Sequence, residues 1–149
     1  MGSLSYPLGD PVYIDANILI YTVERVQPHV KALRAFWRWT NVQSLVVLTS
    51  ELTVLESLVG PLKANNQGLE ARFRRLLFQS ANLRLIPVSR SILERAADLR
   101  ASTPALKTPD AIHAATALEV GARTFITNDL QFRQVPGLSV VTPRDLAAP

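Results

Sequence analysis

The chain has 149 residues, of which 48% are hydrophobic and 19% charged, and it contains no cysteine. This length and composition predict one globular domain with a sizeable core and argue against a disordered chain. The lack of cysteine excludes a disulfide framework, a thiolate zinc site and a cysteine nucleophile. The longest interior apolar run, residues 45–48, is too short to span a membrane, and the first nine residues do not have the pattern of a secretory signal. We therefore expect a cytoplasmic protein that makes no use of a membrane.

The net charge of +4 is concentrated in one segment of the chain. Residues 63–84 hold five basic residues and a single acid, while the basic and acidic residues elsewhere cancel. The basic residues of this segment are Lys63, Arg72, Arg74, Arg75 and Arg84. Such an excess favours a polyanionic partner such as nucleic acid or an acidic protein, although a solvated helix face explains the same pattern.

The first half of the chain reads as strand, two helices, strand and helix. A strand is expected at residues 12–15 (VYID), and the residues after it, NILIY, start a helix. A second helix is expected from Pro28, because proline is favoured at the first helical position. Residues 45–49 (LVVLT) predict a buried strand, and Ser50 caps the helix that follows. The apolar side of that helix is formed by Leu52, Leu55, Leu58, Val59 and Leu62.

The second half continues the alternation of helices and strands. The expected elements are a basic helix at 69–80, a strand at 83–88, a helix at 91–100, a helix from 108 to 120, and strands at 124–127 and 138–142. Thr108, Pro109 and Asp110 supply a cap, a proline and a first-turn acid, and Gly121 stands just past the end of the same helix. Strands separated by helices of this length predict an α/β fold of three layers, with a parallel sheet covered on both faces.

Four acidic residues fall where ligands bind in such folds, at the carboxyl ends of the strands. Asp15 ends the first strand, Glu56 lies in the helix after the second, Asp110 begins the helix that leads to the fourth, and Asp129 follows the fourth strand. The acids are 41, 54 and 19 residues apart, so only tertiary folding brings them together. Two of them also have simpler explanations, because Asp110 suits a helix dipole and Asp129 suits a turn.

A cluster of four carboxylates is unfavourable unless cations neutralise it, because like charges raise one another's pKa. Oxygen ligands without cysteine or a zinc-type histidine spacing favour Mg²⁺ or Mn²⁺. Such an ion activates water and stabilises the charge of phosphodiester hydrolysis. Asn17 is placed to orient Asp15 or a bound water. His113, one turn after Asp110, is interpreted as a bystander near the site, and the lack of a glycine-rich phosphate loop argues against a nucleotide or dinucleotide enzyme.

The sequence resembles the PIN-domain ribonucleases and, within them, the VapC-type toxins of toxin–antitoxin pairs. The resemblance rests on YIDANILIY around Asp15, TSELTVLES around Glu56, TPDAIHAATAL around Asp110 and FITNDLQF around Asp129. It implies a single PIN domain at residues 12–143, preceded by an extension at 1–11 and followed by a tail at 144–149. The family also implies a central parallel sheet of order 3-2-1-4-5.

The resemblance further implies an endoribonuclease with an acidic Mg²⁺ or Mn²⁺ centre. By position, Asp15 and Asp110 would be the principal metal ligands, with Glu56 and Asp129 completing the set. Thr127 and Asn128 match the polar positions beside the last acid.

The expected partners are RNA, a VapB-type antitoxin that blocks the centre, and a second copy of the chain. The basic helix, with Arg72, Arg74 and Arg75, would bind the RNA backbone. Two alternatives remain open at this stage: a PIN-fold nuclease of RNA maturation outside a toxin pair, and a non-catalytic module that binds RNA or protein.

Overall fold

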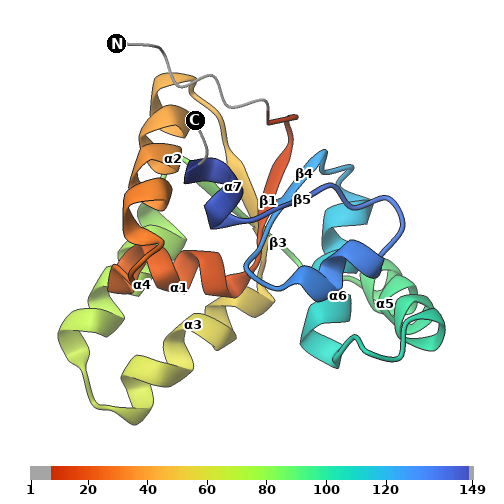
Figure 1. The fold of residues 1–149 in the computed structure, drawn as a ribbon. Helices are drawn as coiled ribbons and strands as arrows, with labels where there is room; N and C mark the ends of the chain where they lie inside the picture. The colour runs from red at the N-terminus through yellow and green to blue at the C-terminus, as the bar shows by residue number, and fades with distance from the viewer. Residues whose placement is uncertain (1–7, 148–149) are drawn as a thin grey trace.

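The sheet at the centre of the molecule has five parallel strands in the order β3-β2-β1-β4-β5, which confirms the predicted order (Figure 1). The computed structural model describes residues 8–147. Its strands are β1 (Val12–Ile14), β2 (Val47–Ser50), β3 (Leu83–Ile86), β4 (Thr124–Ile126) and β5 (Val140–Val141). Its helices are α1 (Ala16–Glu24), α2 (Val30–Val42), α3 (Leu52–Lys63), α4 (Gln67–Gln79), α5 (Arg90–Ser102), α6 (Thr108–Glu119), the short 3₁₀ helix η1 (Leu130–Gln134) and α7 (Pro143–Ala147).

Helices cover both faces of the sheet, as the three-layer prediction requires. Helices α1, α2, α4 and α7 lie on one side, and α5 and α6 lie on the other (Figure 1). Strand β1 shows why, because Val12 and Ile14 belong to the core of the first side while Tyr13 points to the core of the second. Side chains of successive strand residues alternate between faces, so a strand that is apolar throughout is buried on both.

The helix boundaries follow local signals, with small shifts from those expected. Helix α2 begins at Val30 rather than at Pro28. Gly121 adopts a left-handed backbone with φ of +67° directly after α6, which is the conformation that glycine tolerates best. The expected tail is helical as far as Ala147, and the outer residues of the expected extension and tail, 1–7 and 148–149, lie outside the described residues.

Helix α3 differs most from its sequence pattern. Only Leu58 of the predicted apolar side is buried, together with three residues that were not expected there: Thr53, Ser57 and Pro61. Leu55, Val59 and Leu62 are exposed instead. Because the helix packs on the molecule through its small polar residues, it presents an apolar stripe to the outside.

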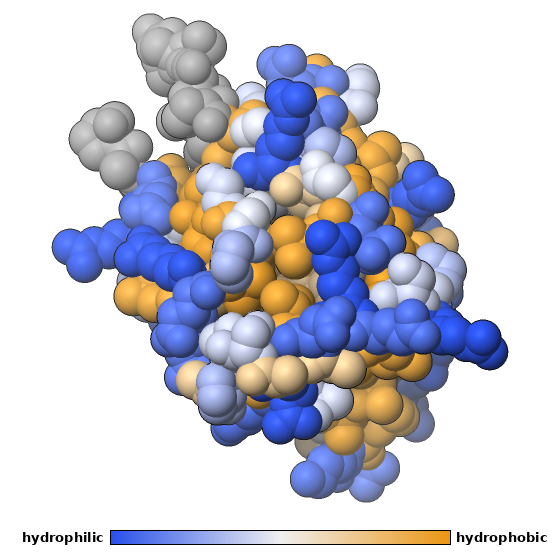
Figure 2. Space-filling model, turned by 90° about the vertical axis from the view of Figure 1, so that its right-hand side faces the viewer, coloured by the Kyte–Doolittle hydropathy of each residue, from blue (hydrophilic) through white to orange (hydrophobic). Residues whose placement is uncertain are grey.

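The side of the molecule that carries α5 and α6 has both hydrophobic and hydrophilic side chains on its surface. Over α5 and α6, hydrophobic side chains lie between hydrophilic ones (Figure 2), and Leu93 of α5 is 48% exposed. None of the helices within residues 8–147 is long and apolar enough to cross a membrane.

Candidate functional site

Asp15 lies at the junction of β1 and α1, at the carboxyl end of the central strand. Its side chain is the N-cap of α1, because Oδ1 accepts a hydrogen bond from the backbone N–H of Ile18 at 3.2 Å. Thr127, just after β4, donates from Oγ1 to Oδ2 of the same carboxylate at 2.5 Å. The residue is only 5% exposed. Helix α1 and the segment just after β4 therefore hold one buried carboxylate in a fixed orientation.

The loop after β4 ties the last acid to the first. Thr127 Oγ1 accepts a hydrogen bond from the backbone N–H of Asp129 at 3.0 Å while it donates to Asp15. Asp129 Oδ1 in turn accepts from the N–H of Gln131 at 2.9 Å and caps η1. The capping role that the sequence left open for Asp129 is thus present, and it places this acid two residues from the group that holds Asp15.

Glu56 is held by His113, which reaches it from α6. His113 Nε2 lies 2.6 Å from Glu56 Oε1, and Nδ1 of the same ring lies 2.7 Å from the hydroxyl of Tyr13 on β1. His113 is 2% exposed, whereas the side chain of Glu56 is 27% exposed. Contrary to the expectation of a bystander, His113 therefore orients one of the four acids. The signal available in the sequence was a histidine one turn after Asp110, on the face that points inward.

Burial of Tyr13 agrees with one order of donors in this chain of hydrogen bonds. Removal from water is the main cause that raises the pKa of Tyr13 well above its ordinary value, and the charge of Asp15 adds to it. The phenol therefore keeps its proton and has a hydroxyl hydrogen to donate toward Nδ1 of His113. In the tautomer that matches this direction, the N–H at Nε2 donates a hydrogen bond to Oε1 of Glu56.

Glu56 and Asp129 lie close enough to the other two acids to contribute to their pKa shifts. Burial is the largest cause that raises the pKa of Asp15, and the charge of Glu56 adds to the rise, while the hydrogen bond from Thr127 opposes it. Burial also raises the pKa of Asp110, and the charges of Asp129 and Glu56 contribute further. All four predicted acids thus share one electrostatic environment at the carboxyl end of the sheet.

This donor set fits a divalent cation in its chemistry. Among the described residues, no three histidine or acidic side chains are arranged as a ready metal-binding group. The carboxylates are nevertheless hard oxygen ligands, and their mutual repulsion is what a cation would relieve. Asp15 and Asp110, the two acids with raised pKa values, gain most from such an ion.

The remaining predicted residues lie outside this cluster. Asn17 is exposed, and within residues 8–147 its side chain makes no hydrogen bond to Asp15, whose orientation comes from Thr127 and Ile18. Asn128 is exposed beside Thr127. The predicted RNA-binding residues, Arg72, Arg74 and Arg75, are exposed on α4, and Arg74 forms an ion pair with Glu70 at 2.8 Å.

Comparison with known proteins gives one family and a consistent set of structures. Residues 12–138 match the PIN domain family. A toxin–antitoxin complex from Klebsiella pneumoniae contains a chain of 32% identity, with a TM-score of 0.66 over 89% of this chain and 97% of that one. VapBC2 from Rickettsia felis bound to a promoter DNA fragment gives 18% identity and a TM-score of 0.74, covering 88% and 98% of the two chains. FitAcB from Neisseria gonorrhoeae gives 23% identity and a TM-score of 0.68, covering 89% of this chain and 98% of that one. No curated protein gives a significant match.

Proposed function

The chain belongs to the PIN-domain family, and from this premise we propose that it is a metal-dependent endoribonuclease and the VapC-type toxin of a type II toxin–antitoxin pair. One observation carries the proposal. The buried carboxylate of Asp15 is held at the end of the central strand by Thr127, and burial, with a smaller contribution from neighbouring acids, raises the pKa values of Asp15 and Asp110. A purely structural role does not explain a charged group kept at such a position.

In the proposed reaction, Asp15 and Asp110 would hold Mg²⁺ or Mn²⁺, and Glu56 and Asp129 would complete the acidic set directly or through water. When bound, the ion supplies an activated water and neutralises charge on the scissile phosphate. The protein's own residues keep the ligands in place: Thr127 orients Asp15, and His113 orients Glu56. The products are a 5′-phosphate and a 3′-hydroxyl.

The antitoxin partner is supported by the Klebsiella complex, which is a toxin–antitoxin complex and shares 32% identity over 89% of this chain. We assign the chain to the cytoplasm, with a VapB-type antitoxin that blocks the acidic centre. The exposed arginines of α4, Arg72 and Arg75 above all, bind the RNA backbone. The apolar stripe of α3, made of Leu55, Val59 and Leu62, binds a second copy of the chain.

The test is cleavage of a mixed RNA pool by the purified protein with Mg²⁺, with Mn²⁺ and with EDTA. Asp15→Asn is the matched loss-of-charge variant, and Asp98→Asn, at an exposed acid of α5 outside the cluster, is its control. We expect metal-dependent cutting that EDTA and Asp15→Asn abolish and that Asp98→Asn retains. RNA that is bound but never cut in any metal favours the non-catalytic module instead.

The toxin assignment has its own test, since a nuclease of RNA maturation also cuts RNA. Expression of the chain alone is expected to arrest growth, and co-expression with the small reading frame next to its gene is expected to restore it. Growth arrest that Asp15→Asn does not relieve contradicts toxicity through the acidic centre. A nuclease whose expression leaves growth unaffected belongs to the RNA-maturation alternative.

A further inference from the structure

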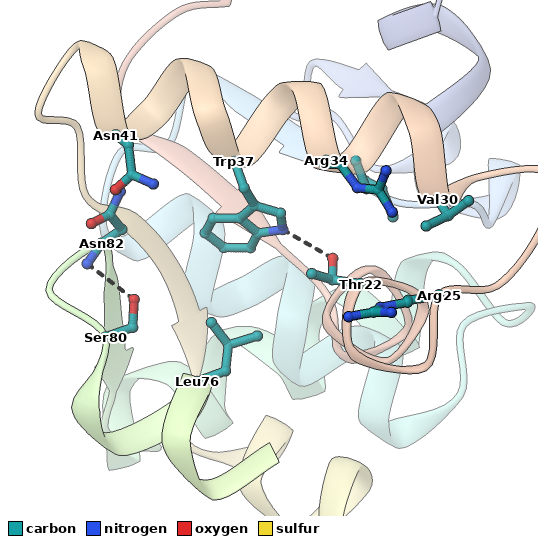
Figure 3. Close-up of a pocket in the computed structure, with 10 residues that line it drawn as sticks. Thr22, Arg25, Val30, Arg34, Trp37, Asn41, Leu76, Ser80 and Asn82 are labelled. Atoms are coloured by element: carbon teal, nitrogen blue, oxygen red, sulfur yellow. Dashed lines mark hydrogen bonds between the residues drawn. The ribbon is translucent and has the colours of Figure 1, made fainter. Parts of the chain in front are cut away.

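A second concave site lies away from the acids, between α1, α2 and the turn from α4 into β3 (Figure 3). The cavity has a volume of about 350 Å³, which is within the range of small-ligand sites. None of the four acids lines it, and no other acidic residue does. Its walls carry two arginines, a tryptophan and two asparagines, so the chemistry of its lining differs from end to end.

One end of the cavity is cationic. Arg25 follows α1 and Arg34 lies on the facing side of α2, and both side chains line the cavity (Figure 3). Within residues 8–147, neither guanidinium forms an ion pair or a hydrogen bond. Two guanidinium groups without a protein partner provide a fork of donors that suits the oxygens of a phosphate.

The backbone at Arg25 adds to this observation. Arg25 is left-handed, with φ of +54°, and its N–H bonds to the carbonyl of Tyr21 at the end of α1. Glycine is the residue that this conformation favours, because a Cβ atom is strained there. An arginine at such a position has an unfavourable backbone, and its guanidinium lies at the cavity.

The middle of the cavity has an aromatic wall. The indole of Trp37 is fixed at its edge, because Nε1 donates to Thr22 Oγ1 at 2.9 Å, and the ring stacks on Phe36 with centroids 5.2 Å apart. Leu76 of α4 lines the cavity opposite α2 (Figure 3). A flat ring held between fixed neighbours is suited to stack a nucleobase.

The other end offers hydrogen bonds of both kinds. Asn82 Nδ2 donates to Asn41 Oδ1 at 2.6 Å. This pairing leaves the amide nitrogen of Asn41 as a donor and the amide oxygen of Asn82 as an acceptor. A neighbouring donor and acceptor match the edge of a base.

We propose that this cavity binds one nucleotide of the RNA strand, with its phosphate at Arg25 and Arg34 and its base at Trp37, Asn41 and Asn82. The inference rests on the proposed function for its RNA, although the nucleotide chemistry stands on the cavity alone. Helix α1 connects the two sites, since Asp15 caps its first turn and Arg25 follows its last. The nine residues of the helix span about 14 Å at 1.5 Å per residue. An RNA chain that enters the acidic centre can therefore place one of its nearby nucleotides in the cavity.

The first experiment measures nucleotide binding by fluorescence. The chain has two tryptophans, so Trp39→Phe leaves Trp37 as the only reporter. The four nucleoside monophosphates are titrated into this protein, and a nucleoside and inorganic phosphate are titrated as separate arms. We expect quenching by the monophosphates and weaker binding of either part alone.

Two variants and one control locate the binding. Arg25→Gly removes a guanidinium at a position where glycine relieves the backbone, so this variant is expected to fold. Arg25→Gly and Arg34→Ala should each weaken binding by roughly tenfold or more, as for loss of a charge-assisted hydrogen bond. Arg90→Ala, on the far side of the sheet, should leave it unchanged. If Arg25→Gly and Arg34→Ala bind the monophosphates as tightly as the control Arg90→Ala, the proposal is overturned.

The second experiment links the cavity to RNA. The affinity of an RNA oligonucleotide is measured on Asp15→Asn protein, and KM is measured on active protein, each with and without Arg25→Gly. We expect weaker RNA binding and a higher KM. Antitoxin binding lost in Arg25→Gly, with nucleotide and RNA binding intact, assigns the cavity to a protein partner and overturns the proposal. If the protein cuts RNA and neither arginine affects nucleotide binding or KM, this inference is refuted and the proposed function is not. If monophosphates quench Trp37 but the protein cuts no RNA, the proposed function is refuted and nucleotide binding at the cavity is not.

Discussion

The ring of His113 lies 2.6 Å from the carboxylate of Glu56, and its other nitrogen is bonded to the hydroxyl of Tyr13. A buried relay of hydrogen bonds thus runs from the central strand through α6 to an acid on α3. Tyr13 is fully buried, and His113 nearly so. Because both inner members are fixed by packing, the orientation of Glu56 is set by the core of the protein rather than by solvent.

Replacing His113 should therefore affect turnover more than RNA binding. His113→Ala is expected to lower kcat by about tenfold to a hundredfold, with KM for RNA nearly unchanged, because groups that orient a ligand have effects of this size. It should also cost about 1–3 kcal/mol of unfolding free energy, since the hydroxyl of Tyr13 loses its partner. Tyr13→Phe keeps the bond to Glu56 and should retain more activity. Equal loss in both variants would show that His113 acts only through packing.

Asp15→Asn should stabilise the metal-free protein while it abolishes its response to metal. Burial raises the pKa of Asp15, so the ionised side chain opposes folding near neutral pH. Asparagine is also a good N-cap and can still accept from the N–H of Ile18. We expect a Tm increase of about 3 °C, equivalent to roughly 1 kcal/mol in a chain of this size. The wild type should show a Tm rise on adding Mg²⁺, and the variant none. A lower Tm in Asp15→Asn without metal contradicts this account.

The pH dependence follows from the direction of the same shifts. Burial is the main cause that raises the pKa values of Asp15 and Asp110 above the ordinary value of an aspartate. Between the ordinary and the raised pKa values the native state binds more protons than the unfolded state, so these two groups add stability as the pH falls through that window. Metal binding requires both carboxylates ionised, so the Mg²⁺-dependent rise in Tm should shrink over the same window. Thermal melts across pH, with and without Mg²⁺, measure both trends, and a metal response that grows on acidification contradicts them.

The apolar stripe of α3 should control the oligomeric state. Leu55, Val59 and Leu62 are 65%, 48% and 51% exposed, so a charged residue at any of them leaves the core untouched. Leu55→Glu combined with Val59→Glu is expected to convert a dimer to a monomer without lowering Tm. Val42→Glu, at a residue of α2 that is 73% exposed, is the control. Size-exclusion chromatography with light scattering gives the mass of each variant. A wild type that is monomeric at every concentration shows that the stripe is not a dimer contact.

Ser57 provides a stability test on the buried side of α3. Its hydroxyl is buried and, among the described residues, has no hydrogen-bond partner. Ser57→Ala should therefore raise the free energy of unfolding by about 1 kcal/mol. Thr53, one turn earlier, shares a 2.7 Å hydrogen bond with Thr49, so Thr53→Val should lower it. Denaturant unfolding of the two variants should give opposite signs.

Much of the fold could be predicted because its signals are local. Each strand contains a short apolar stretch, and α6 has Pro109 in its first turn and Gly121 two residues after its end, as expected. The position of α3 was less predictable. A helix with apolar residues on several sides has no single face that the sequence marks as buried, and the buried face of α3 includes the polar residues Thr53 and Ser57.

The candidate site was predictable in its acids and not in the groups that hold them. Asp15 stood out as a charge after a buried strand, which needs a partner wherever it lies. His113, the partner of Glu56, is 57 residues after it in the chain, and Tyr13, the other partner of His113, is 100 residues before His113. No spacing along the chain reports such contacts. The cavity at Arg25 could not be predicted either, because no sequence signal indicates that this arginine has a left-handed backbone.

Helix α1 joins the acidic centre to the second cavity. It begins directly after Asp15 and ends at Arg25, and it contains no proline or glycine that would let it bend. If the centre cuts RNA and the cavity binds one of its nucleotides, as proposed, this helix fixes the distance between the bound nucleotide and the cut bond. The protein would act as a ruler, cutting at a constant offset from one base, and lengthening α1 by a turn would move the cleavage position along the strand.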